Sequence, residues 1–243
     1  GRQTSPIAGT IMHRSHVPVQ EWFWAAYLVA THTPGISALQ LQRQLGIGNY
    51  RAAWHLLHRL RRGMLNEERT CLSGLIEAGE TYSGGPAKGK TGRGVAAAKH
   101  KPPVACAVEV LTYKDDEGRP RERVGRVRLQ AIQDAGEKSI GTFVRRHIEP
   151  GSRIRTDGWC GYSDTALAGY THSVRIVGAP ERVHQRAPHI HRMVSNLKTW
   201  LLGTHHGVEP TYLQSYLDEY VFRFNRCRTP MAAFQTLLGI SSR

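Results

Sequence analysis

Two short stretches of the sequence carry acids where a β-strand would hold them. The first reads IEAGETYSGG and places Glu77 and Glu80 on either side of Gly79. The second reads SRIRTDGW, a short strand pattern that ends at Asp157. Carboxylates from two strands can hold Mg²⁺, which prefers oxygen ligands, and two such ions can clamp the attacking and leaving oxygens of a phosphodiester. The pattern is typical of metal-dependent phosphoryl transfer, which needs a third ligand.

A late helical segment, HIHRMVSNLKTWLL, offers candidates for that third position. His191 and Lys198 are seven residues apart, nearly two full turns, and therefore share a face of the helix. Asn196 lies about 200° from Lys198 on the helical wheel, so those two do not reach the same small site. An imidazole can bind a divalent ion, although it suits softer metals than Mg²⁺, and a lysine can hold a phosphate as a point charge. The alternative is that His191 is a surface histidine on a basic helix.

The elements around these residues follow an order that indicates a fold class. Periodicity predicts three strands, a helix, a strand ending at Asp157, a small helix, a strand and two closing helices. This is the order of an RNase H-like α/β domain, in which the first and fourth strands are neighbours. A carboxylate from each could then meet at one edge of the sheet. The predicted elements span residues 72–82, 102–113, 121–132, 136–148, 152–157, 161–170, 171–177, 189–202 and 211–227.

Residues 1–66 read as a separate helical region, followed by the α/β domain over residues 67–243. Ser37 is a plausible N-cap for a helix through Leu45, a glycine-containing turn follows, and a second helix runs from about Asn49 to Arg62. This is a helix-turn-helix pattern, whose second helix can enter a DNA major groove. The alternative is a three-helix packing unit with a solvated basic face. The side chains predicted to face outward and contact DNA are Asn49, Arg51, His55, His58, Arg59 and Arg62.

The charge balance supports a polyanionic partner. The chain has 33 Lys+Arg against 19 Asp+Glu, and the excess of 14 positive charges is spread along its length. Nucleic acid fits best, because each neutralised phosphate releases counterions, although an anionic membrane surface or a ribosome would also attract such a chain. The 4 cysteines form no Cys-x-x-Cys pair, and no apolar run approaches the length of a membrane span, so we expect a cytoplasmic protein. Residues 84–101, rich in glycine and lysine, read as a mobile basic loop or a linker.

Several segments together resemble the IS1595-type (ISXO2-like) bacterial insertion-sequence transposases, over essentially the whole chain. The resemblance is carried by AGTIMHRS, WFWAAYLVATHTPGISALQLQRQLGI, AAWHLLHRLR, IEAGETYSGG, TDGWCGYS, SNLKTWLLGTHHGV and YLDEYVFRFNRC. It implies an RNase H-like fold and Mg²⁺- or Mn²⁺-dependent nicking of transposon ends, followed by joining to target DNA, at the bacterial nucleoid. Synapsis of two double-stranded ends implies a homodimer in the DNA complex. Similar members place Glu, Asn or His at the third catalytic position, with a lysine after it, which maps onto His191 and Lys198, or alternatively onto Asn196.

Two departures from the family pattern change what we expect of this copy. The family's strand motif reads Glu-x-Asp-Glu-Thr-Tyr-x-Gly-Gly, so Gly79 stands where the first catalytic Asp belongs, leaving Asp157 and His191 as metal ligands. Glu77 shares the strand face of Gly79 and is a candidate substitute, whereas Glu80 points to the other face. Many relatives also carry an amino-terminal zinc ribbon, which suggests a truncated or shortened copy. We expect a folded, DNA-binding but catalytically impaired transposase. The rivals are a non-catalytic DNA-binding derivative and an RNase H-like nuclease unrelated to transposition.

Overall fold

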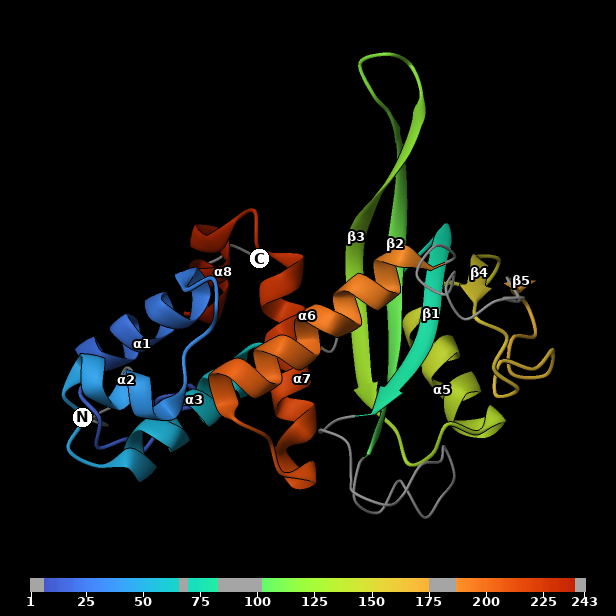
Figure 1. Cartoon of the computed structure of the whole chain (residues 1–243). Helices are drawn as coiled ribbons and strands as arrows, with labels where there is room; N and C mark the ends of the chain where they lie inside the picture. The colour runs from blue at the N-terminus through green and yellow to red at the C-terminus, as the bar shows by residue number, and fades with distance from the viewer. Residues whose placement is uncertain (1–6, 66–69, 83–101, 175–186, 239–243) are drawn as a thin grey trace, which may run out of the picture.

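The computed structural model describes residues 7–65, 70–82, 102–174 and 187–238. Within them a mixed five-stranded sheet has the order β3-β2-β1-β4-β5 (Figure 1). The first three strands are antiparallel, whereas β4 runs parallel to β1 and β5 parallel to β4. This confirms the predicted RNase H-like α/β fold and the adjacency of its first and fourth strands. The strands are β1 (Leu75–Tyr82), β2 (Pro103–Lys114), β3 (Pro120–Ala131), β4 (Arg153–Thr156) and β5 (Thr171–Val174).

Helices cover both faces of this sheet (Figure 1). On one face α5 (Glu137–His147) buries Ile140, Phe143 and Val144 against β1, β2 and β4. On the other face α6 (Pro188–His205) and α7 (Leu213–Asn225) pack on β2 and β3, with Cys106 and Val108 in the shared core. The buried apolar residues of these helices belong to the two cores on either side of the sheet. The sheet is therefore buried on both faces, as strands in an α/β domain commonly are.

The amino-terminal helices are α1 (Val19–Thr31), α2 (Ala38–Leu45) and α3 (Tyr50–Gly63), and the bounds of α2 and α3 are close to those predicted. Ser37 caps α2 by accepting a hydrogen bond from the Gln40 amide. Gly46 ends α2 in the left-handed conformation, at φ 64°, which glycine adopts without steric cost. The core of these helices also contains Phe222 from α7 and two residues from α8 (Pro230–Leu237), namely Ala233 and Leu237. The first and last parts of the chain therefore share one apolar cluster.

Two features differ from the predicted elements. Residues 161–170 form a series of turns, so the predicted small helix is wrong. One helical bond forms there, from the Leu167 amide to the Ser163 carbonyl, but the turn does not propagate, in keeping with the cost of helix nucleation. The helix α8 was not predicted. The predicted basic loop at 84–101 and the end of the strand at 175–177 lie outside the described residues.

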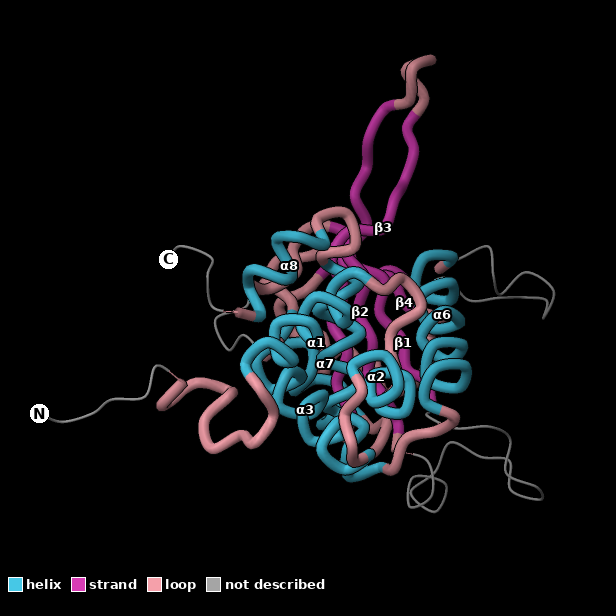
Figure 2. Tube along the Cα trace, turned by 90° about the vertical axis from the view of Figure 1, so that its left-hand side faces the viewer, coloured by secondary structure: helices cyan, strands magenta, loops and turns pink. Residues whose placement is uncertain are grey.

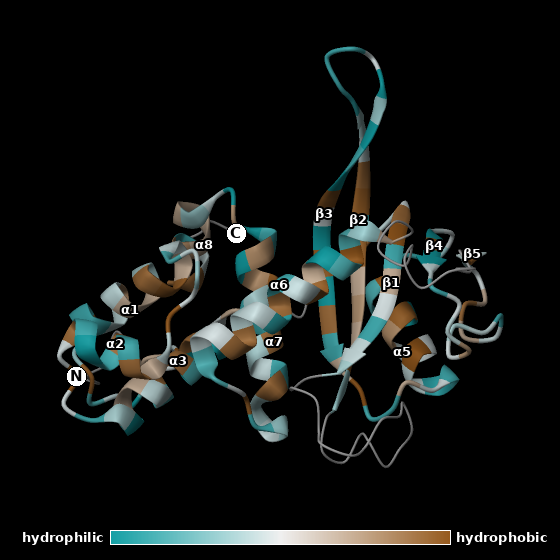
Figure 3. Cartoon of the chain, viewed as in Figure 1, coloured by the Kyte–Doolittle hydropathy of each residue, from teal (hydrophilic) through white to brown (hydrophobic). Residues whose placement is uncertain are grey.

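The hairpin that joins β2 and β3 extends well beyond the rest of the molecule (Figures 1 and 2). The strands pair from Leu111 with Arg123 out to Lys114 with Pro120. Its tip is hydrophilic (Figure 3) and is braced by Asp115, whose side chain accepts hydrogen bonds from Arg121 and from the Arg119 amide. The base of this hairpin brings Glu122 back toward β1 and α6.

Candidate active site

The parallel pairing of β1 and β4 brings the two predicted carboxylate positions to the same level of the sheet. The last β1–β4 pair joins Glu77 to Arg155; Gly79 lies two residues further along β1, and Asp157 lies two residues further along the chain, just past the end of β4. Asp157 directly follows β4, is exposed, and accepts a hydrogen bond from the Trp159 amide at 3.2 Å. The two predicted positions therefore lie just beyond the point where the parallel pairing of β1 and β4 ends, and α/β folds commonly place reacting groups near the carboxyl ends of parallel strands.

Gly79 has no structural need to be glycine. Its φ lies outside the left-handed region, so the backbone accepts any residue. A Cβ added there would lie 3.3 Å from Cδ1 of Ile190 in α6, which is tight but can be relieved by a few tenths of an ångström at the end of a flexible side chain. Gly79 therefore faces α6, and a carboxylate at this position would point toward the first turns of that helix.

The helix α6 carries the three candidates for the remaining roles. His191 directly follows Ile190 and is partly buried, while Asn196 and Lys198 are exposed. Asn196 is six residues beyond Ile190, about 9 Å along the helix axis, so it is further from Gly79 than His191 is. Burial raises the pKa of the Cys106 thiol well above its usual range, and Lys198 is the cation that opposes this rise. Cys106 pairs directly with Gly79 across the sheet.

A buried tyrosine, Tyr162, packs in the core between the sheet and α5. Burial raises the pKa of Tyr162 well above its usual value, and the charges of Glu80, Cys106 and Asp157 add to the effect. The phenol therefore stays neutral at physiological pH. Glu80 is on the same face of β1 as Ile76 and Ala78, which pack against α5. It therefore belongs to the opposite face of β1 from Gly79, as predicted.

Glu77 shares the face of Gly79, as the strand alternation predicted, but both of its oxygens are already engaged. Its side chain is fully buried, and Oε2 accepts hydrogen bonds from the amides of His189 and Ile190, each at 3.0 Å. Its Oε1 accepts from Nη1 of Arg155 at 3.3 Å. The geometry therefore does not favour Glu77 as a replacement metal ligand for the missing Asp.

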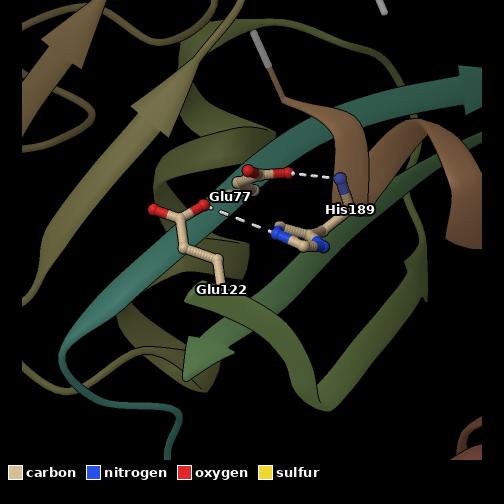
Figure 4. A group of neighbouring side chains, drawn as sticks. All are labelled: Glu77, Glu122 and His189. Atoms are coloured by element: carbon tan, nitrogen blue, oxygen red, sulfur yellow. Dashed lines mark hydrogen bonds and ion pairs between the residues drawn. The ribbon is translucent and has the colours of Figure 1, made fainter. Parts of the chain in front are cut away.

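Glu77, Glu122 and His189 form a compact cluster (Figure 4), and their ligand atoms all lie within 4.8 Å of one another. Arg155 already supplies the positive charge there, because its guanidinium contacts both carboxylates at 3.3 to 3.4 Å. Burial raises the pKa of Glu122, but the hydrogen bonds and charge of Arg155 outweigh this and hold it below its ordinary value. The cluster is therefore an ion-pair network. The sequence did not predict this network, because its residues come from four different elements. They are Glu77 on β1, Glu122 on β3, Arg155 on β4 and His189 on α6.

The residues present do not fit the two-ion centre of an intact copy. Gly79 offers no ligand, and the cluster of Glu77, Glu122 and His189 contains neither Asp157 nor His191. Of the predicted ligands, Asp157 and His191 are present in the described residues, and their role as metal ligands stays a prediction.

Most of the chain matches the model of a known protein family. The model of the ISXO2-like transposase domain matches residues 71–225, well over half of the chain. The chain belongs to the ISXO2-like transposase family. The matched range contains Gly79, Asp157 and all of α6, so the site described above lies inside the transposase domain. No curated protein matches the chain. In the described parts of the transposase, no helix has both the length and the apolarity to cross a bilayer.

The helix α3, which precedes the transposase domain in the sequence, exposes fewer of the predicted DNA-contacting side chains than expected. Arg51, His55 and Arg62 are exposed, and Asn49 is exposed while its side chain caps the helix by accepting from the Arg51 amide at 2.8 Å. Arg59 is only partly exposed, because it donates to the carbonyl of His13 at 2.8 Å. A pocket of about 390 Å³ beside it is lined by Gly9, Thr10, Ile11, His13, Arg59 and Arg62.

The prediction that His58 faces outward is wrong. Its ring lies 3.9 Å from that of Trp54 and also contacts Tyr212 and Tyr216 near the start of α7. Burial, with a smaller effect of the Arg61 charge, lowers the pKa of His58 from 6.5 to about 4, so it is neutral at physiological pH. The helical period alone could not reveal that α7 covers this side of α3.

An ion pair between α3 and α7, Arg61 with Glu219, was also not predicted from the sequence. Nε of Arg61 donates to Oε2 of Glu219 at 2.7 Å, with the side chains 2% and 1% exposed. The guanidinium lies 3.8 Å from the centre of the Tyr216 ring. A buried arginine in the last turn of α3 therefore joins the amino-terminal helices to α7 of the transposase domain. Nothing in the spacing of these residues in the sequence pairs them.

Proposed function

We propose that this chain is a transposase that binds double-stranded transposon ends through residues 1–66, and that the α/β domain of residues 67–243 descends from a metal-dependent nicking and joining enzyme. The observation that carries the proposal is the placement of Gly79 and Asp157 two residues beyond the last β1–β4 pair, with α6 over Gly79. In an intact copy, Mg²⁺ or Mn²⁺ between these positions would activate water or a 3′-hydroxyl for in-line attack on a phosphodiester.

The proposed roles follow from this placement. Asp157 is the remaining strand carboxylate, His191 is the third ligand, and Lys198 holds a phosphate. The position of His191 directly after Ile190 supports it over Asn196. Recognition of DNA is assigned to the exposed basic side chains of α3, with Arg59 contributing from the edge of its pocket. We further propose that two copies act as a homodimer on two ends at the bacterial nucleoid. The DNA-contacting residues are Asn49, Arg51, His55, Arg59 and Arg62.

In the present sequence the proposal predicts weak chemistry. Loss of one group that stabilises the transition state commonly costs on the order of a thousandfold in rate. Gly79→Asp should therefore raise Mn²⁺-dependent cleavage and joining of transposon-end DNA by roughly that factor. Gly79→Asn is the matched control, because it adds similar volume without the charge, and should stay near the activity of the unaltered chain. Asp157→Asn should abolish the gain.

A second candidate function is a non-catalytic DNA-binding derivative of a transposase. Gly79 itself favours it, since the backbone there would accept an aspartate. Under this alternative the chain binds end DNA tightly, charge reversal at Arg51 and Arg62 abolishes binding, and Gly79→Asp gains no cleavage. Cleavage by Gly79→Asp without joining to a target would instead select an RNase H-like nuclease.

A further inference from the structure

We propose that Glu77 is a positioning residue that holds the first turn of α6 on β1 and β4, and thereby sets where the third catalytic position lies relative to Asp157. The catalytic part of this inference rests on the proposed function, whereas the contacts of Glu77 are independent of it. Figure 4 shows the Glu77 carboxylate directed at the start of α6.

The helix α6 lacks a local cap. Its N-cap residue, Ala187, makes no side-chain capping bond, Pro188 occupies the first position, and the first turn contains no acid. The amides of His189 and Ile190 would be left without acceptors, and both donate instead to Glu77, more than a hundred residues earlier in the chain. A carboxylate at a helix N-terminus also interacts favourably with the helix dipole. Because this cap comes from the central strand of the sheet, it attaches the helix to the sheet as well as starting it.

Arg155 extends the attachment to the other strands. It joins Glu77 on β1 to Glu122 on β3 from its own place on β4. His189 completes the circuit, with Nε2 3.5 Å from Oε2 of Glu122. Four elements that carry or flank the candidate active site therefore meet at one ion-pair network, in which Glu77 is buried and Glu122 is exposed.

On β1, β4 and α6 the network lies close to the candidate site along the chain. Gly79 follows Glu77 by two residues, Asp157 follows Arg155 by two, and His191 follows His189 by two. Two residues span about 7 Å on a strand, and on a helix they rise about 3 Å and turn by about 200°. A change at Glu77 is thus transmitted through short, rigid segments to the groups that would hold a metal.

The first test measures the attachment without any metal or DNA. Backbone amide exchange at His189 and Ile190, followed by nuclear magnetic resonance, should accelerate at least roughly tenfold in Glu77→Gln, because the neutral amide no longer attracts Arg155 or the helix N-terminus. Glu109→Gln is the matched control: this buried acid of the same sheet pairs with Arg126, away from α6. It should leave the two amides unchanged. Unchanged exchange in Glu77→Gln would overturn the proposal.

The second test measures positioning. In the Gly79→Asp background, Glu77→Gln should weaken Mn²⁺ binding, measured by calorimetry, by roughly 10- to 100-fold, as losses around metal ligands commonly do. Glu109→Gln in that background should not weaken it. If amide exchange at His189 and Ile190 accelerates in Glu77→Gln but the Mn²⁺ affinity is unchanged, Glu77 is only a helix cap and the positioning role is refuted. If Gly79→Asp itself binds no Mn²⁺, the proposed function fails, and the exchange result alone decides whether Glu77 attaches α6.

Discussion

Replacing Arg61 with methionine should destabilise the chain strongly, because it leaves a buried carboxylate without its main partner. Glu219 is 1% exposed, and its Oε2 is held by Arg61 at 2.7 Å. Its Oε1 has no hydrogen-bond partner among the described residues, although Nη1 of Arg223 lies 3.9 Å away. Breaking a buried ion pair by removing one partner commonly costs about 3–5 kcal/mol. With Arg223 nearby, we expect about 3 kcal/mol, a large share of the roughly 5–15 kcal/mol that stabilises a typical protein.

The assay is urea unfolding followed by circular dichroism, in which Arg61→Met should lower the midpoint without changing the slope. Arg62→Met is the control on the same helix, since Arg62 is exposed, and it should change the free energy of unfolding by no more than about 0.5 kcal/mol. The double variant Arg61→Met with Glu219→Met should recover most of the loss, because an apolar pair can replace a buried ion pair. A cost below about 1 kcal/mol for Arg61→Met, or a double variant no more stable than the single one, would refute the reasoning.

Two further predictions concern pH and DNA. Burial lowers the pKa of His205 from 6.5 to about 4, so the unfolded chain binds a proton that the folded chain rejects between these values, and stability should fall as the pH drops from about 6.5 toward 4. Thermal unfolding across this range should show a shallower pH dependence in His205→Gln, and an unchanged dependence would contradict the assignment. Arg51→Ala should weaken binding to all DNA sequences alike. It should also reduce the slope of log K against log salt concentration by about one unit, the contribution of one phosphate contact. Arg119→Ala, at the hairpin tip where Arg119 pairs with Glu117, should do neither, and equal effects of the two changes would argue against α3 as the DNA-binding surface.

Local signals in the sequence were enough to predict most of the elements. Ser37 and Gly46 bound α2 because capping and left-handed glycine are properties of a few neighbouring residues. The alternation in β1 correctly placed Glu77 and Gly79 on one face. The prediction failed for residues 161–170, where helical spacing existed over a stretch too short to overcome nucleation.

The site was harder to predict because it depends on contacts between distant residues. The strand order placed Gly79 near Asp157, but nothing local showed that Glu77 would cap a helix 112 positions away. The helical period placed His58 on the outward face of α3, but its ring contacts Tyr216 of α7. Such pairings are set by tertiary packing, which helical and strand periods do not encode.

In the proposed function, Gly79 and Asp157 lie on either side of the metal position. A crystal of Gly79→Asp soaked in Mn²⁺ would locate the metal through its anomalous signal. We expect a peak between the introduced carboxylate and Asp157, beside the first turns of α6. A peak among Glu77, Glu122 and His189 instead, or no peak beside Asp157, would rule this placement out.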